Sequence, residues 1–391
     1  MQNRNSPSGL AAVLVAATLY NLPFGTIYAF SVFLKPMESL LSLTRAQMTL
    51  VFALATISVT VGMIVAPRLY RSLAPAPILI VAGLTSAAGL LLTAQAEGMA
   101  HFALGYGLLF GLGGGVGFIV MQQATNQIAT RMSGLINGYI VSLYPLGAML
   151  GAPLFGWGIA AYGLRASFTA LALTVAIAAL ASAILIARAK LRMHGAPIGT
   201  DAAPPGDAAL FRRLFMVFFL AAAAGLTVMS QAAGIVQAYG GATALALGGT
   251  TFITGAIAAA RIGGGALVDR FSVARVACGA HIWSLAGAAL IAVWPAPVAV
   301  VIALAMIGMG YGILSGLTAA TIPRYWERNA YGRIASRMYI AWCVAALSLP
   351  VVAGWLFDRT QGYGAALTIA AALNLAGAVM GLGLPPAPKR P

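Results

Sequence analysis

Long apolar stretches separated by short polar segments run through almost the whole chain. Each of twelve stretches is about 20 residues long, enough for an α-helix to cross a hydrocarbon core roughly 30 Å thick. The stretches lie at about 9–34, 47–67, 76–96, 101–126, 134–158, 166–187, 213–238, 243–268, 275–294, 297–321, 335–357 and 363–384. This pattern predicts an all-α membrane protein with twelve transmembrane helices.

The composition supports this interpretation. Hydrophobic residues make up 61% of the chain and charged residues 7%, whereas a soluble domain carries roughly 25% charged residues. A soluble globule is therefore excluded, and the lipid bilayer is the expected surrounding. In a soluble protein, a net charge of +15 would suggest binding to nucleic acid. Here the basic residues lie mostly in the segments between the predicted spans, so we expect no nucleic-acid partner.

The basic residues lie mostly on one side of the predicted spans. If the N-terminus is cytoplasmic, all but five of the 22 Lys and Arg residues fall in cytoplasmic segments. The exceptions are Lys35, Arg45, Arg165 and Arg359 on the outer side, and Arg261, which fits neither side. Because cytoplasmic loops are enriched in Lys and Arg, we expect both termini in the cytoplasm and a location in a bacterial inner membrane. The first stretch is too long for a secretory signal and is expected to stay as a helix.

The chain divides into two similar halves. A polar stretch at 188–212 follows the sixth span and predicts a cytoplasmic linker between halves at 1–187 and 213–391. The glycine-rich segment 113–117 in the fourth span corresponds to 308–312 in the tenth, and Gly156-Trp157 corresponds to Gly354-Trp355. Six-helix halves in parallel duplication are a known transporter design, in which the substrate binds near the bilayer midplane where the halves meet.

One segment between the eighth and ninth spans resembles a motif of the major facilitator superfamily. Gly265-Ala-Leu-Val-Asp269-Arg270, followed by Arg275, is similar to the superfamily's cytoplasmic motif of glycine, aspartate and basic residues. The counterpart after Gly62 reads Ala66-Pro67-Arg68 and lacks the aspartate. The resemblance implies the major facilitator fold and a gating role for Asp269 and Arg270.

A closer resemblance is to the oxalate:formate antiporter family and related bacterial monocarboxylate transporters. It is carried by the segment from Gly25 through Tyr28 to Pro36, and by Tyr331-Gly332-Arg333 and Trp342 in the second half. This resemblance implies a substrate-binding arginine in the eighth helix, at the position of Arg261. Oxalate transporters of the family also carry a lysine in the eleventh helix, where this chain reads Tyr339-Ile340-Ala341-Trp342-Cys343.

Arg261 is also singled out by physical chemistry alone. It lies eight residues before Asp269 in the eighth span, about 12 Å from the cytoplasmic end of that helix. A charge at that depth costs at least about 2.5–3.5 kcal/mol, and the seven acidic residues all fall in loops or at span ends. A guanidinium matches a carboxylate in bidentate fashion, so a transported anion is the natural counter-ion. The structural alternative is that Arg261 reaches the cytoplasmic interface or Asp269.

Seven other residues are candidates for lining the same cavity. We expect hydrogen-bonding or apolar wall roles at Tyr28, Phe118, Gln122, Tyr311, Ser315, Trp342 and Cys343. For each of them, helix packing is the alternative interpretation, because buried amides and hydroxyls also bond between helices.

Motifs of other protein classes are absent from the sequence. It contains no phosphate-binding loop, no metal-ligand cluster and no nucleophile triad. We therefore expect no cofactor, no metal and no enzyme, and predict a monomeric carrier of a small carboxylate, coupled to protons or a counter-transported anion. Two alternatives remain open, an oxalate or dicarboxylate:formate exchanger of the same fold, and an anion channel or intramembrane enzyme.

Overall fold

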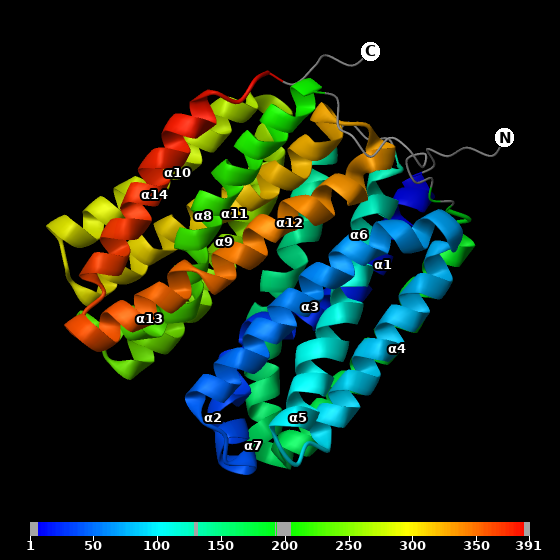
Figure 1. The fold of residues 1–391 in the computed structure, drawn as a ribbon, viewed down its shortest axis with the longest axis horizontal. Helices are drawn as coiled ribbons and strands as arrows, with labels where there is room; N and C mark the ends of the chain where they lie inside the picture. The colour runs from blue at the N-terminus through cyan, green and yellow to red at the C-terminus, as the bar shows by residue number, and fades with distance from the viewer. Residues whose placement is uncertain (1–6, 129–131, 192, 194–204, 387–391) are drawn as a thin grey trace. The chain divides into compact units, whose positions relative to one another are not determined.

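The computed structural model describes residues 7–128, 132–191, 193 and 205–386, which are almost entirely helical and contain no strand. The helices of the first part are α1 (Pro7–Phe24), η1 (Gly25–Ala29), α2 (Phe30–Leu41), α3 (Arg45–Ser72), α4 (Pro75–Ala94), α5 (Met99–Phe102), η2 (Ala103–Phe110), α6 (Gly111–Asn126) and α7 (Ser133–Arg188). Those of the second part are α8 (Pro205–Ala238), α9 (Thr243–Arg270), α10 (Val273–Val293), α11 (Pro297–Tyr325), η3 (Arg328–Ala330), α12 (Tyr331–Leu347), α13 (Leu349–Thr360) and α14 (Gly364–Leu382) (Figure 1).

The predicted all-α membrane architecture is confirmed. Eleven helical segments of the described chain are long and apolar enough to cross a membrane, and one of them, α7, contains two predicted spans. Its 56 residues are interrupted at Gly163, where φ is +83° and ψ is 170°. Only glycine adopts that conformation without strain, so the chain turns there between the spans predicted at 134–158 and 166–187. Within the linker predicted at 188–212, residues 192 and 194–204 lie outside the described residues, and α8 already begins at Pro205.

The first predicted span is not one continuous α-helix. A 3-10 segment, η1, separates α1 from α2, and Pro23 lies just before it. A Cβ atom at Gly25 would lie 2.3 Å from the Tyr144 carbonyl oxygen and 2.6 Å from the Gly147 Cα. The backbones of the first and fifth spans therefore meet closely at this point. A 3-10 stretch within a helix often marks a hinge or a strained segment.

The chain packs as two compact units. The first unit comprises the helices up to Asn126, α7 from Leu143 onward, and the segment Glu327–Tyr339. The second comprises α7 up to Ser142, the helices from α8 to Trp326, and the chain from Ile340 onward. Two helices, α7 and α12, thus contribute one segment to each unit.

An aromatic core fills the first unit. Phe33 contacts Tyr106 at 5.2 Å and Phe168 at 5.1 Å between ring centroids, and Tyr106 contacts Phe110 at 5.1 Å. Phe33, Tyr106, Phe110 and Phe168 are each no more than 1% exposed. In the same unit α3 and α4 both pack against α6, beside which they run in Figure 1.

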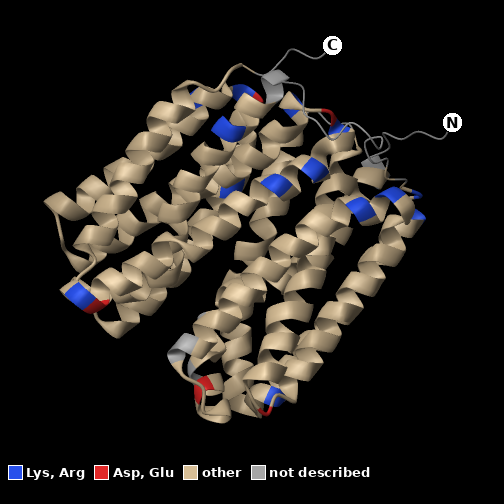
Figure 2. Ribbon diagram, in the orientation of Figure 1, with Lys and Arg blue, Asp and Glu red and all other residues tan. Residues whose placement is uncertain are grey.

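Charged residues of the described chain gather at helix ends (Figure 2). Arg71 lies in the last turn of α3, Arg188 in that of α7, Arg270 in that of α9 and Arg324 in that of α11. Arg261 departs from this distribution, because it lies nine residues before the end of α9.

Candidate functional site

Arg261 is buried in the second unit, with 4% of its surface exposed. Its Nη1 donates to the backbone carbonyl of Val141 at 2.7 Å, and its Nη2 donates to the hydroxyl of Tyr311 at 2.9 Å. The guanidinium carbon also lies 5.2 Å from the centroid of the Tyr311 ring, within the range of a cation–π interaction. These two acceptors are a neutral carbonyl and a neutral hydroxyl, and together they orient the guanidinium.

Tyr311 is held firmly in place. It is 1% exposed, and its ring stacks with Phe218 of α8 at 6.5 Å. A Cβ atom at Gly225 of α8 would lie 2.2 Å from the Tyr311 Cβ, so glycine at that position leaves room for the tyrosine. The structure thus brings together two of the residues predicted to bind substrate, Arg261 and Tyr311, from α9 and α11.

Three further predicted residues of this unit are also buried. Ser315 follows Tyr311 by one turn of α11 and is 4% exposed, while Trp342 and Cys343 in α12 are 6% and 8% exposed. Burial is equally expected of packing residues, so substrate contact stays a prediction for all three.

A second cluster of predicted residues lies in the first unit. The ring of Phe118 in α6 contacts Tyr144 at 5.0 Å and Tyr339 at 5.4 Å. Gln122, one turn further along α6, donates from Nε2 to the Tyr339 hydroxyl at 3.1 Å. Tyr28 in η1 is half-buried and meets Tyr144 edge-on at 6.3 Å. Four aromatic rings and one amide are therefore gathered here.

The sequence predicted no role for Tyr339 or Tyr144. Tyr339 is the last residue of the α12 segment that packs in the first unit, and Gln122 and Tyr339 are 217 residues apart in the chain. A signal for Tyr339 was present, because it falls within the stretch that corresponds to the lysine-bearing segment of oxalate transporters. Nothing in the sequence around Tyr339 indicated that its hydroxyl bonds to Gln122.

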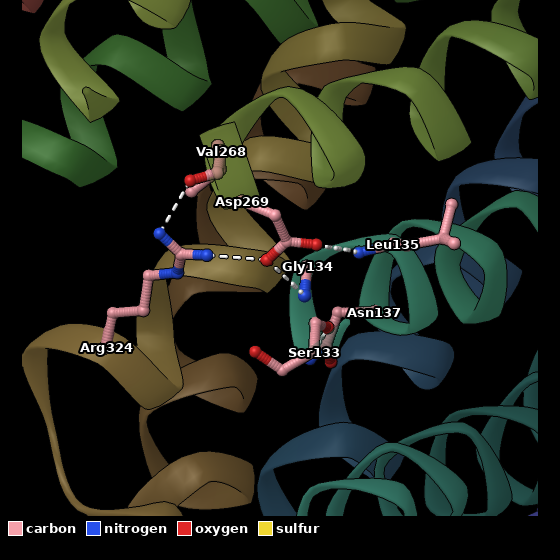
Figure 3. A network of polar contacts seen from close by, with 7 residues as sticks. All are labelled: Ser133, Gly134, Leu135, Asn137, Val268, Asp269 and Arg324. Atoms are coloured by element: carbon pink, nitrogen blue, oxygen red, sulfur yellow. Dashed lines mark hydrogen bonds and ion pairs between the residues drawn. The ribbon is translucent and has the colours of Figure 1, made fainter. Parts of the chain in front are cut away.

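Asp269, predicted to act in gating, binds the first turn of α7 (Figure 3). Its two carboxylate oxygens accept from the backbone N–H groups of Gly134 and Leu135, each at 3.0 Å. Arg324 of α11 completes the network, with Nη2 2.5 Å from Asp269 Oδ1 and Nη1 2.6 Å from the Val268 carbonyl. A carboxylate at a helix N-terminus is stabilised by the unpaired N–H groups and the helix dipole. Arg270, predicted with Asp269, is exposed.

Gln123 makes a similar arrangement at the first turn of α12, which the sequence did not predict. Its Oε1 accepts from the Gly332 N–H at 2.7 Å, and its Nε2 donates to the Arg328 carbonyl at 3.1 Å. The Tyr70 hydroxyl lies 3.5 Å from the same Oε1. A neutral side-chain amide of α6 therefore holds the first turn of α12 within the first unit.

Comparison with known proteins gives short, distant sequence matches. No family model matches the chain. An uncharacterised MFS-type transporter of Escherichia coli (strain K12), YhjX, is 22% identical over 136 residues, 35% of this chain and 34% of that protein. Monocarboxylate transporter 13 of Rattus norvegicus is 25% identical over 157 residues, 40% of this chain and 37% of that protein. The matches thus span about a third of the length of these relatives.

Solved structures match over nearly the whole chain. The proton:xylose symporter XylE superposes with a TM-score of 0.77 at 13% identity, covering 97% of this chain and 96% of that one. The transporter FucP gives 0.74 at 16% identity, covering 96% and 98%, and the human organic anion transporter MFSD10 gives 0.71 at 14% identity, covering 96% and 100%. The chain therefore has the fold of the major facilitator superfamily, and it is a multi-pass membrane protein.

Proposed function

We propose that the chain is a secondary active transporter of small organic anions that works by alternating access, with Arg261 binding the carboxylate. The single observation that carries this proposal is a 4%-exposed guanidinium in a membrane-spanning helix, hydrogen-bonded to neutral oxygens of Val141 and Tyr311. A charge in that position is costly and marks a substrate or ion pathway. A carboxylate is the anion whose geometry the planar guanidinium fork matches.

Monocarboxylates such as lactate and formate are the substrates we propose. Arg261 is a single cation, so a monoanion balances it, whereas a dianion would leave one negative charge uncompensated in a medium of low dielectric constant. The name of the rat relative, monocarboxylate transporter 13, supports the same substrate class. We also propose that both termini are cytoplasmic, as the distribution of basic residues indicates. The protein would be a monomer in a bacterial inner membrane.

Ligand-dependent thermal stabilisation of the purified protein tests this proposal. A ligand that binds only the folded state raises the unfolding temperature by mass action. We expect lactate or formate to raise it in the wild type and oxalate to have little effect. Arg261→Lys should lose most of the shift, because lysine keeps the charge but not the fork, and Arg261→Ala should lose all of it.

The matched control is Arg165→Lys, since Arg165 is an exposed arginine of α7. This variant should respond to ligand as the wild type does. Counterflow in proteoliposomes, in which unlabelled carboxylate accelerates uptake of labelled carboxylate, separates a carrier from a channel. Wild-type uptake by Arg261→Ala would contradict the site assignment, and a preference for oxalate would contradict the substrate class.

A further inference from the structure

The carbonyl that Arg261 binds lies in the interior of a helix, where carbonyls are normally already bonded. In an α-helix the carbonyl of residue 141 accepts from the N–H of residue 145. Residue 145 is a proline inside α7, and proline has no N–H and its ring crowds the carbonyl four residues before it. The Val141 carbonyl therefore lacks its usual helical donor, and Arg261 Nη1 supplies one at 2.7 Å.

We infer that Pro145 is a positioning residue for Arg261, because it exposes the carbonyl that orients the guanidinium toward its anion. Val141 and Tyr311 bond to the two terminal nitrogens from different helices, α7 and α11. A guanidinium is planar, so fixing both nitrogens fixes the plane and direction of the whole group. The assignment of a carboxylate as the anion rests on the proposed function, whereas the link between Pro145 and Arg261 does not.

Close packing of α7 on α9 makes this contact possible. Gly138 lies one turn before Val141, and a Cβ atom there would lie 2.5 Å from the Arg261 carbonyl oxygen. A larger residue would push the two backbones apart and lengthen the bond from Arg261 Nη1. The same helix pair meets again at Gly134, where a Cβ atom would lie 2.2 Å from the Gly265 carbonyl oxygen.

A second proline in the same helix provides a matched control. Pro153 also lies inside α7, and it is exposed. By the same rule it removes the helical donor of the Met149 carbonyl, which is not the carbonyl that Arg261 Nη1 bonds. Replacing either proline by alanine restores one backbone N–H to the helix, so a general effect of straightening α7 should appear in both variants.

The experiment compares formate and lactate affinity of Pro145→Ala, Pro153→Ala and wild type, each purified as a monodisperse protein. In Pro145→Ala the new N–H competes with Arg261 for the Val141 carbonyl and weakens the hydrogen bond that orients the guanidinium. We therefore expect the Kd to rise about tenfold. Pro153→Ala should stay within about twofold of wild type. In an Arg261→Lys background Pro145→Ala should have an effect below about twofold. Wild-type affinity in Pro145→Ala, or an equal loss in Pro153→Ala, would overturn the inference.

A second measurement tests the link between Pro145 and Arg261 without any ligand. It therefore separates an error in this link from an error in the proposed substrate. Apparent unfolding temperatures of wild type, Pro145→Ala, Arg261→Met and the double variant form a cycle. If Arg261 bonds the Val141 carbonyl, the shifts in unfolding temperature should be non-additive. Pro145→Ala should then change the unfolding temperature less when Arg261 is already replaced. Additive shifts would overturn the inference even if carboxylates bind, and non-additive shifts would sustain the link even if none binds.

Discussion

At the scale of single residues, the chain keeps the Arg261 guanidinium inside a membrane-spanning helix and bonds it to neutral acceptors. The Tyr311 hydroxyl accepts from Arg261 Nη2 at 2.9 Å, and the ring lies beside the guanidinium. Hydrogen bonds to a charged group contribute about 1.5–3 kcal/mol, more than those between neutral groups. The hydroxyl and the ring of Tyr311 therefore make separable contributions to the orientation of Arg261.

Tyr311→Phe removes the hydroxyl and keeps the ring, so we expect carboxylate affinity to fall about tenfold, which corresponds to roughly 1.4 kcal/mol. Isothermal titration with formate measures the change. Tyr325→Phe is the control, because Tyr325 lies in the same helix and its hydroxyl bonds to the Pro385 carbonyl at 2.6 Å instead. Equal losses in the two variants would show that the effect comes from α11 as a whole.

At the scale of helices, two first turns are held by side chains from other helices. The carboxylate of Asp269, which pairs with Arg324, holds the first turn of α7. The neutral amide of Gln123 holds the first turn of α12. Charge-assisted hydrogen bonds are stronger than neutral ones, and partly exposed ion pairs weaken as salt concentration rises. The two helix ends therefore differ in chemistry although they belong to corresponding spans.

Asp269→Asn should loosen the first turn of α7. An amide offers one oxygen where the carboxylate offers two, so one of the N–H groups of Gly134 and Leu135 loses its acceptor and the ion pair with Arg324 is lost. We expect amide hydrogen exchange in residues 133–137 to accelerate about tenfold, which corresponds to roughly 1.4 kcal/mol. Asp358→Asn, an exposed position near the end of α13, should leave that exchange unchanged. Unchanged exchange in Asp269→Asn would contradict the interpretation.

At the scale of the whole molecule, the acidic residues that the structure describes lie near helix ends or in connections (Figure 2). Asp269 is the penultimate residue of α9, and Asp358 is two residues from the end of α13. Glu38 lies in the last turn of α2. Proton coupling through a carboxylate buried deep in a span therefore has no support among the described residues.

Anion exchange should accordingly proceed without a pH gradient. We expect counterflow of labelled formate in proteoliposomes to keep its rate, within about twofold, when a protonophore removes the gradient; coupling through the substrate and Arg261 is compatible with this result. Empty liposomes and Arg261→Ala serve as controls. A strictly proton-driven uptake that disappears on mutation of one loop carboxylate would contradict this prediction.

The fold could be predicted from the sequence to a large extent, and the site only in part. Hydropathy located the spans because a helix must be apolar over its whole length to cross a bilayer. It missed the 3-10 segment at 25–29, since that break depends on the approach of Gly25 to Tyr144 and Gly147. Substrate binding by Arg261 and Tyr311 stays a prediction, and the hydrogen bond between these two residues was not predicted.

The sequence by itself determined the class of the molecule, its number of spans and the singular position of Arg261, because hydropathy along the chain shows where each span lies and which charge falls inside one. The tertiary structure alone decided the partners. Val141 is 120 residues from Arg261, and Tyr339 is 217 from Gln122. Such pairs depend on which helix faces pack together and how closely glycines let them approach, and hydropathy along the chain carries neither kind of information.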